Sequence, residues 1–240
     1  MNRVAIIVQA RVGSSRLPGK VLKPLHGSMC VLDVLITRLQ SVTAIHAPVL
    51  AIPHGKTDDK LDDLAENASW DVWRGSEQDV LGRYYDAARM IEADTIVRVT
   101  SDCPLVDSNV VHYCLREFHN GQMFGDGCDY LSNCHPTRTM PRGFEVEVFS
   151  RAALEWANLS ARSVSDREHV TPWLYNNLPA SRVKTYTPPD GPVEFPHNLS
   201  IDTQEDLDRV AAVVAKLGRL DFTWREAVAA AHELADKESS

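Results

Sequence analysis

The first half of the chain alternates short apolar runs with stretches whose apolar residues have helical spacing. The runs predict strands at residues 4–8, 49–52, 70–73 and 95–100. The helical spacing predicts helices around residues 31–39, 61–68, 80–91 and 109–118. Strands that alternate with helices indicate βαβ units. We therefore predict an α/β fold whose mostly parallel, Rossmann-like sheet is flanked by helices.

The second half is less regular. Residues 145–149 alternate Glu-Val-Glu-Val-Phe, which predicts a half-buried strand, whereas residues 119–143 are rich in Gly, Asn, Pro and Thr and predict a long excursion. We also expect strands at 182–187 and 199–201, and helices at 152–158, 165–177, 204–217 and 223–236. Internal repeats and linkers are not evident. We expect a single domain, residues 1–240, with an inserted lobe at about residues 121–180.

Composition excludes several classes of protein. The chain has 25 Lys and Arg against 33 Asp and Glu, a formal charge of −8, which argues against a nucleic-acid-binding protein. Apolar runs stay well short of the roughly 18 residues of a membrane span. Five cysteines without a CxxC pair suggest neither a disulfide framework nor a zinc ribbon. We expect reduced thiols in a cytoplasmic protein.

The loop after the first strand has the composition of a phosphate site. Gly13 and Ser14 are small and let backbone N–H groups approach an anion, while Arg11, Arg16 and Lys20 could neutralise a triphosphate. Ligands of parallel sheets bind at the carboxyl ends of the strands, where this loop begins. The sequence matches neither the ATPase P-loop nor the dinucleotide fingerprint. The alternative is a solvated basic turn.

Two separated aspartates are candidate ligands of Mg²⁺, which prefers oxygen. Asp102 follows the strand at 95–100, and Asp202 follows the short strand predicted at 199–201. Asp102 could instead stabilise an Asx-turn. Asp202 could instead cap the next helix, unless Thr203 is the cap, in which case Asp202 is free to bind a metal.

Five stretches resemble one protein family. They are ARVGSSRLPGKVL (10–22), RGSEQDVLGRYY (74–85), RVTSDCPL (98–105), PRGFEVEVF (141–149) and DREHVT (166–171). Together they are similar to the spore coat polysaccharide biosynthesis protein F family of cytidylyltransferases. More distantly, the chain resembles the 3-deoxy-manno-octulosonate and acylneuraminate cytidylyltransferases. Ser101 and Glu145 depart from the usual family pattern, which has Gly and Asp there. The resemblance implies the nucleotide-diphospho-sugar transferase (GT-A-like) fold.

The resemblance also implies roles for individual residues. Both aspartates would bind Mg²⁺, and Arg11, Arg16 and Lys20 would act in catalysis by holding the phosphates. The nucleotide would contact Gln9, Ala10, Gly13, Ser14, Ser76, Asp79 and Arg83. The acceptor would face Arg142, Glu145, Glu147, Arg167, Glu168 and His169. Ser76 could also cap the helix that follows it, and the acceptor-side charges could instead form an interface between lobes or subunits.

The expected reaction is transfer of CMP from CTP to a sugar or sugar acid, with release of pyrophosphate, for surface polysaccharide biosynthesis. The alternatives are a nucleotide-sugar-dependent glycosyltransferase of related fold and a non-catalytic nucleotide-binding protein. The Asp-x-Asp motif usual in such glycosyltransferases does not follow a predicted strand here, since Asp206 and Asp208 fall on a predicted helix. We expect neither nucleic acid nor a membrane as partner, and a homodimer formed through residues 124–150.

Overall fold

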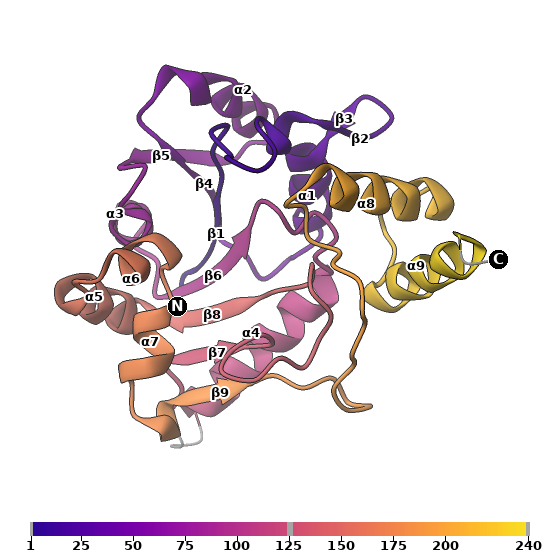
Figure 1. Ribbon diagram of the computed structural model, residues 1–240. Helices are drawn as coiled ribbons and strands as arrows, with labels where there is room; N and C mark the ends of the chain where they lie inside the picture. The colour runs from indigo at the N-terminus through magenta and orange to yellow at the C-terminus, as the bar shows by residue number, and fades with distance from the viewer. Residues whose placement is uncertain (1, 124–126, 239–240) are drawn as a thin grey trace.

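One sheet holds most strands of the protein in the computed structural model, which describes residues 2–123 and 127–238. Its strands are β1 (Val4–Gln9), β4 (Ala47–Pro53), β5 (Asp71–Gly75), β6 (Thr95–Thr100), β7 (Tyr130–Ser132), β8 (Glu147–Ser150) and β9 (Val183–Thr185). Within the described residues the sheet has seven strands, in the order β5-β4-β1-β6-β8-β7-β9 (Figure 1). β8 runs antiparallel to both neighbours, and the other pairs are parallel. The predicted α/β fold with a mostly parallel sheet is confirmed.

Apolar side chains cover both faces of the sheet. The helices are α1 (Val31–Leu39), α2 (Asp59–Asn67), α3 (Val80–Met90), α4 (Ser108–Met123), α5 (Arg151–Ser160), α6 (Val164–His169), α7 (Pro172–Asn177), α8 (Gln204–Leu217) and α9 (Trp224–Glu238). Ile6 and Val8 of β1 belong to one apolar cluster with residues of α1, α2, α4, α8 and α9, whereas Ala5 and Ile7 belong to a second cluster with residues of α3, α5 and α7. Successive strand residues point to opposite faces, so residues 4–8 of β1 are all apolar because helices cover both faces of the strand.

Two elements predicted in the second half, a strand at 199–201 and one helix at 165–177, were wrong. Residues 199–201 form no strand, because their amides pair with two loops: Leu199 N–H donates to the Arg142 carbonyl (3.1 Å) and Ile201 N–H to the Asp102 carbonyl (2.7 Å). The helix expected at 165–177 is split into α6 and α7 at Val170, whose φ is 72°. Pro172 opens α7, since proline has no N–H with which to continue a helix.

The strand β8 is fully buried, where the sequence predicted a half-buried one. It lies in the sheet between β6 and β7, so neither of its edges is open. The predicted inserted region, 121–180, supplies β7, β8 and α5–α7, and residues 124–126 lie outside the described part. In Figure 1 helices α5 and α6 lie beside α3. A role of this region in dimerisation stays a prediction.

Smaller features complete the fold. A hairpin of β2 (Pro24–His26) and β3 (Met29–Cys30), which the sequence did not predict, follows the short 3-10 helix η1 (Lys20–Leu22). Two more 3-10 turns are η2 (Lys56–Asp58) and η3 (Ala180–Arg182). All five cysteines are free and buried. Among the described residues, none of the helices has the length and apolar character needed to cross a membrane.

Candidate active site

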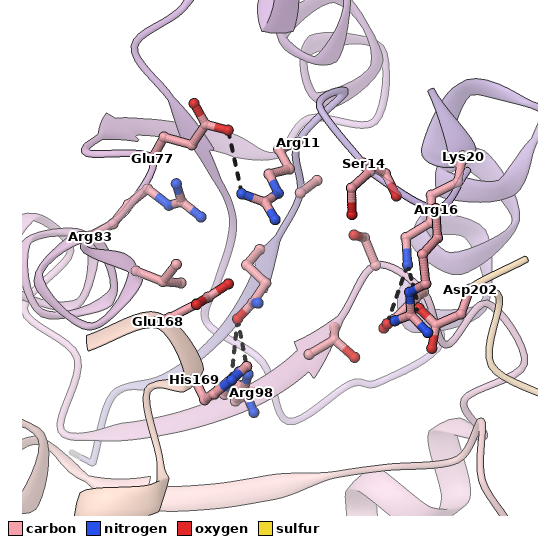
Figure 2. A pocket seen from close by; sticks show the side chains of 17 residues that line it. Arg11, Ser14, Arg16, Lys20, Glu77, Arg83, Arg98, Glu168, His169 and Asp202 are labelled. Atoms are coloured by element: carbon pink, nitrogen blue, oxygen red, sulfur yellow. Dashed lines mark hydrogen bonds and ion pairs between the residues drawn. The ribbon is translucent and has the colours of Figure 1, made fainter. Parts of the chain in front are cut away.

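A cleft of about 310 Å³ opens where β1 and β6 end (Figure 2). We call it the nucleotide cavity. Predicted site residues that line it are Gln9, Ala10, Arg11, Ser14, Arg16, Lys20, Arg83, Asp102, Glu168, His169 and Asp202. A second cavity of about 640 Å³, the acceptor cavity, is lined by Arg142 and Glu145 and shares Asp102, His169 and Asp202 with the first. The two aspartates therefore lie where the cavities meet.

The loop that follows β1 and carries Arg11, Arg16 and Lys20, which we call the basic loop, is folded back onto the protein. The buried carboxylate of Asp58 accepts a hydrogen bond from Val12 N–H (2.7 Å), and Gly19 N–H donates to the Val12 carbonyl (3.0 Å). Gly19 has a φ of 68°, a left-handed conformation that glycine adopts without steric cost. Leu17 is buried below the loop. These anchors fix the loop beside the cleft, which Arg11, Arg16 and Lys20 line, although the side chains of Arg11 and Arg16 stay exposed to solvent.

Lys20 lies between the two predicted metal ligands. Its Nζ is 3.5 Å from Asp102 Oδ2 and 3.2 Å from Asp202 Oδ1, and it donates to the Ile201 carbonyl (2.7 Å). Arg16 adds a second contact to Asp202 Oδ1 (3.0 Å). Figure 2 shows Arg16 and Lys20 on one side of the cleft, near Asp202, with Arg11 and Arg83 apart from them. The cations Arg16 and Lys20 thus contact the carboxylates of Asp102 and Asp202 at the junction of the two cavities.

The structure decides between the alternatives for both aspartates, which were a helix cap for Asp202 and an Asx-turn for Asp102. Thr203 is the N-cap of α8, and its hydroxyl accepts from Asp206 N–H, so Asp202 does not cap the helix. The Asp102 carboxylate accepts from Lys20 and from the Cys103 thiol, and within the described residues it bonds no backbone amide of an Asx-turn. Two carboxylates of this kind, facing one space, fit a hard cation such as Mg²⁺. Metal binding itself stays a prediction.

The N-terminus of α3 also differs from one expectation. Asp79 is the N-cap, because its carboxylate accepts from Gly82 N–H (2.9 Å), while the Ser76 hydroxyl accepts from Asp79 N–H (3.1 Å). Asp79 also forms an ion pair with Arg167 of α6. This pair holds α6 against α3 and thereby places Glu168 and His169 at the cleft.

Arg83 is a buried cation at the cleft. Its guanidinium donates to the Ser76 carbonyl (2.9 Å), and its Nε is buried without a partner in the described part of the chain. Burial lowers the pKa of Arg83, and the positive charge of nearby Arg11 lowers it further. Among the residues that the structure describes, Arg11 has one ion-pair partner, the exposed Glu77, at 3.3 Å. Positive charge that lacks full compensation here suits an anionic ligand.

Some predicted residues line neither cavity: Gly13, Ser76, Asp79, Glu147 and Arg167. Glu147 is 3% exposed and pairs with Arg98 of β6, a residue that sequence reasoning missed although it lines both cavities. Burial alone would raise the pKa of Glu147, but the Arg98 charge and hydrogen bonds from Thr171 and Tyr130 outweigh it and lower that pKa. The sequence could have identified Arg98 as a site residue, because it is an arginine inside an otherwise uncharged predicted strand.

The acceptor cavity combines a fixed carboxylate, Glu145, with an exposed cation, Arg142. Glu145 is held by Arg138 (2.7 Å) and by Gly143 N–H (2.7 Å). The exposed Arg142 guanidinium has no hydrogen-bond or ion-pair partner within residues 2–123 and 127–238. The missed residues His135 and Tyr175 also line this cavity, and their rings stack with centroids 4.8 Å apart.

Comparison with known proteins places this site in a family. The model of the cytidylyltransferase family matches residues 5–227. The spore coat polysaccharide biosynthesis protein SpsF of Bacillus subtilis is 32% identical over 223 residues, which cover 91% of this chain and 89% of SpsF. A cytidylyltransferase structure from Leptospira borgpetersenii superposes with a TM-score of 0.88 at 30% identity, covering 99% of this chain and 95% of that one.

A more distant structure shares the fold. CMP:2-keto-3-deoxy-manno-octonic acid synthetase complexed with CTP is 14% identical and has a TM-score of 0.67, over 90% of this chain and 99% of that chain. The predicted nucleotidyltransferase fold is thereby confirmed. With the match over nearly its whole length, the chain belongs to the cytidylyltransferase family, and it is a CTP-dependent nucleotidyltransferase.

Proposed function

We propose that the protein transfers CMP from CTP to a sugar or sugar acid, with release of pyrophosphate, in the synthesis of a surface polysaccharide. One observation carries the proposal: Asp102, Asp202 and the Lys20 ammonium lie at the junction of two cavities. One cavity has the cations that a triphosphate needs, and the other is open to a second substrate. The name of SpsF, a spore coat polysaccharide protein, supports the polysaccharide role.

The residues support an in-line displacement. The acceptor oxygen attacks the α-phosphorus of CTP from the acceptor cavity, and pyrophosphate leaves toward the basic loop. Arg11, Arg16 and Lys20 hold the β- and γ-phosphates and stabilise the charge on the leaving group. Asp102 and Asp202 would hold Mg²⁺, which when bound would polarise the α-phosphate. The protein contributes mainly position and charge.

The acceptor cavity supports an acceptor with an acidic group. The Arg142 guanidinium, which has no partner in the described part of the chain, can bind a carboxylate through two hydrogen bonds, whereas Glu145 is already held by Arg138. The stacked rings of His135 and Tyr175 offer an apolar surface for a sugar ring. A sugar acid meets both features, and a neutral sugar meets the second alone.

The alternatives have less support. Asp206 of the Asp-x-Asp sequence is occupied as part of the α8 capping box, so that motif does not resemble a glycosyltransferase metal site. Arg11, Lys20, Asp102 and Asp202 all line the cleft, which argues against a non-catalytic protein. The homodimer through residues 124–150 stays a prediction, and residues 124–126 lie outside the described part.

Pyrophosphate release tests the proposal. The protein is incubated with CTP, MgCl₂ and a panel of neutral sugars and sugar acids, and we expect release with sugar acids. Lys20→Ala and Asp102→Ala should each lower turnover by about 10²-fold or more, because charge stabilisation of the transition state is lost. Lys60→Ala and Asp86→Ala, at exposed positions of α2 and α3, are the matched controls. Turnover near wild type in either site variant would refute the assignment.

A further inference from the structure

The side-chain amide of Gln9, at the end of β1, has a fixed orientation. Its Oε1 accepts from Arg98 Nε (3.3 Å) and Arg98 Nη2 (3.1 Å) (Figure 2). A guanidinium has donors and no acceptor, so the oxygen of the amide must face Arg98. Both N–H groups of Gln9 Nε2 are then left for the cleft, and within the described residues they have no protein partner.

Arg98 is itself held on the side away from the cleft. Its guanidinium forms an ion pair with the buried Glu147, and Glu147 Oε1 accepts from Tyr130 Oη and Thr171 Oγ1, both at 2.6 Å. The Arg98 side chain is 11% exposed. A rotation of the Gln9 amide would place its N–H groups against this immobile cation. The protein thus presents hydrogen-bond donors, and no acceptor, from the end of Gln9.

The position of Gln9 assigns these donors to the nucleotide. Gln9 lines the nucleotide cavity and not the acceptor cavity, whereas Arg98 lines both. The triphosphate is assigned to the cations of the loop, Arg11, Arg16 and Lys20. The remaining uncharged part of the nucleotide that carries strong acceptors is the base. An amide with donors alone can bind N3 and O2 of cytosine, which are both acceptors.

We propose that Gln9, positioned by Arg98 and Glu147, selects cytosine over uracil by donating N–H bonds to the N3 and O2 edge of the base. In uracil N3 carries a hydrogen, so two donors would face each other and one Gln9 N–H would lose its partner. An unpaired buried donor costs enough to weaken binding by about tenfold to a hundredfold. The inference rests on the proposed use of CTP but not on the identity of the acceptor.

Exchange of the amide for a carboxylate tests the proposal. Binding of CTP and of UTP, each with MgCl₂ and without any acceptor, is measured by titration calorimetry for the wild type and for Gln9→Glu. The wild type should bind CTP about tenfold or more tighter than UTP. In Gln9→Glu a carboxylate oxygen faces the base, so CTP should weaken by about tenfold and the CTP/UTP ratio should approach or fall below one.

Two more variants define the outcome. Gln9→Met has a similar size without hydrogen bonds and should lower the CTP/UTP ratio without favouring UTP. Gln40→Glu makes the same change of charge at an exposed position after α1 and should leave the ratio unchanged. If Gln9→Glu and Gln9→Met both fold, by circular dichroism, and keep the wild-type ratio, the proposal is wrong. That result would leave the reaction standing, since pyrophosphate release with the sugar panel tests the reaction separately.

Discussion

Glu147 shows how one buried charge can serve a site that it does not touch. The alternating Glu-Val-Glu-Val-Phe stretch predicted a half-buried strand, and the family resemblance placed Glu147 at the acceptor. The structure instead gives it three partners, Arg98, Tyr130 and Thr171, which come from β6, from β7 and from the segment before α7. It therefore joins β6, behind the nucleotide cavity, to the turn between α6, which carries His169, and α7.

Removal of this carboxylate should cost stability. Glu147→Ala leaves the buried Arg98 without its counter-charge, so the free energy of unfolding should fall by about 3–5 kcal/mol. Urea unfolding measures it, with Glu155→Ala on the exposed face of α5 as control. A loss below about 1 kcal/mol, the size expected for an exposed ion pair, would contradict this account.

The same carboxylate should make stability depend on pH. The folded-state pKa of Glu147 lies below its ordinary value near 4.5, so the unfolded chain binds the proton more readily. Its contribution is present above pH 4.5 and is lost as the pH falls through the lower folded-state pKa. Glu147→Gln should remove this part of the acid dependence. If the free energies of unfolding of the wild type and of Glu147→Gln fall in parallel below pH 5, this account of the pH dependence is wrong.

At the scale of elements, the site depends on two loops that touch. Gly143 has a φ of 106°, and a Cβ there would lie 2.5 Å from the carbonyl carbon and oxygen of Leu199. Leu199 precedes Asp202 by three residues, and its N–H bonds the Arg142 carbonyl. Glycine is thus required for the close approach that places Asp202, and the irregular segment 199–201 takes the place of the predicted strand.

Gly143→Ala should therefore impair activity as well as stability. The added Cβ must displace backbone, so we expect Asp202 to shift and turnover to fall about tenfold or more, as misplacement of reacting groups implies. Gly191→Ala is the matched control, because Gly191 has a φ of 91° but nothing within 4 Å of its Cβ position. It should show the backbone strain alone, with turnover unchanged. Equal turnover in the two variants would contradict the role of the contact.

At the scale of the whole molecule, the two halves of the chain share one structure. β8 pairs with β6 of the first half, and its Phe149 packs in the same cluster as Ala5 and Ile7 of β1. The predicted inserted region therefore cannot unfold without exposing core side chains of the first half. This arrangement supports the prediction of a single domain.

Thermal unfolding should accordingly be one transition. Scanning calorimetry of the free protein should give a single peak whose calorimetric and van't Hoff enthalpies agree, because shared core residues make unfolding cooperative. Two resolved peaks, or residues 121–180 unfolding first by hydrogen exchange, would show that this region is a separate unit.

The sequence by itself determined the features that depend on local pattern. The apolar run 4–8 became β1, and Thr95–Thr100 became β6. The rule that parallel strands end at one edge brought the basic loop and Asp102 to the same cleft. Such features need only neighbours along the chain and the general geometry of βαβ units, so they can be inferred before any contact is known.

Contacts between distant residues were decided only by the tertiary structure. Lys20 meets aspartates 82 and 182 residues away, and Arg98 meets Glu147, 49 residues away. Hydrophobic pattern does not specify which polar side chains will face each other. That depends on strand order, on the turn at Val170 and on the contact of Gly143 with Leu199. The sequence therefore specifies which types of residue are available to the site, whereas the packing of remote segments decides which of these residues contact one another.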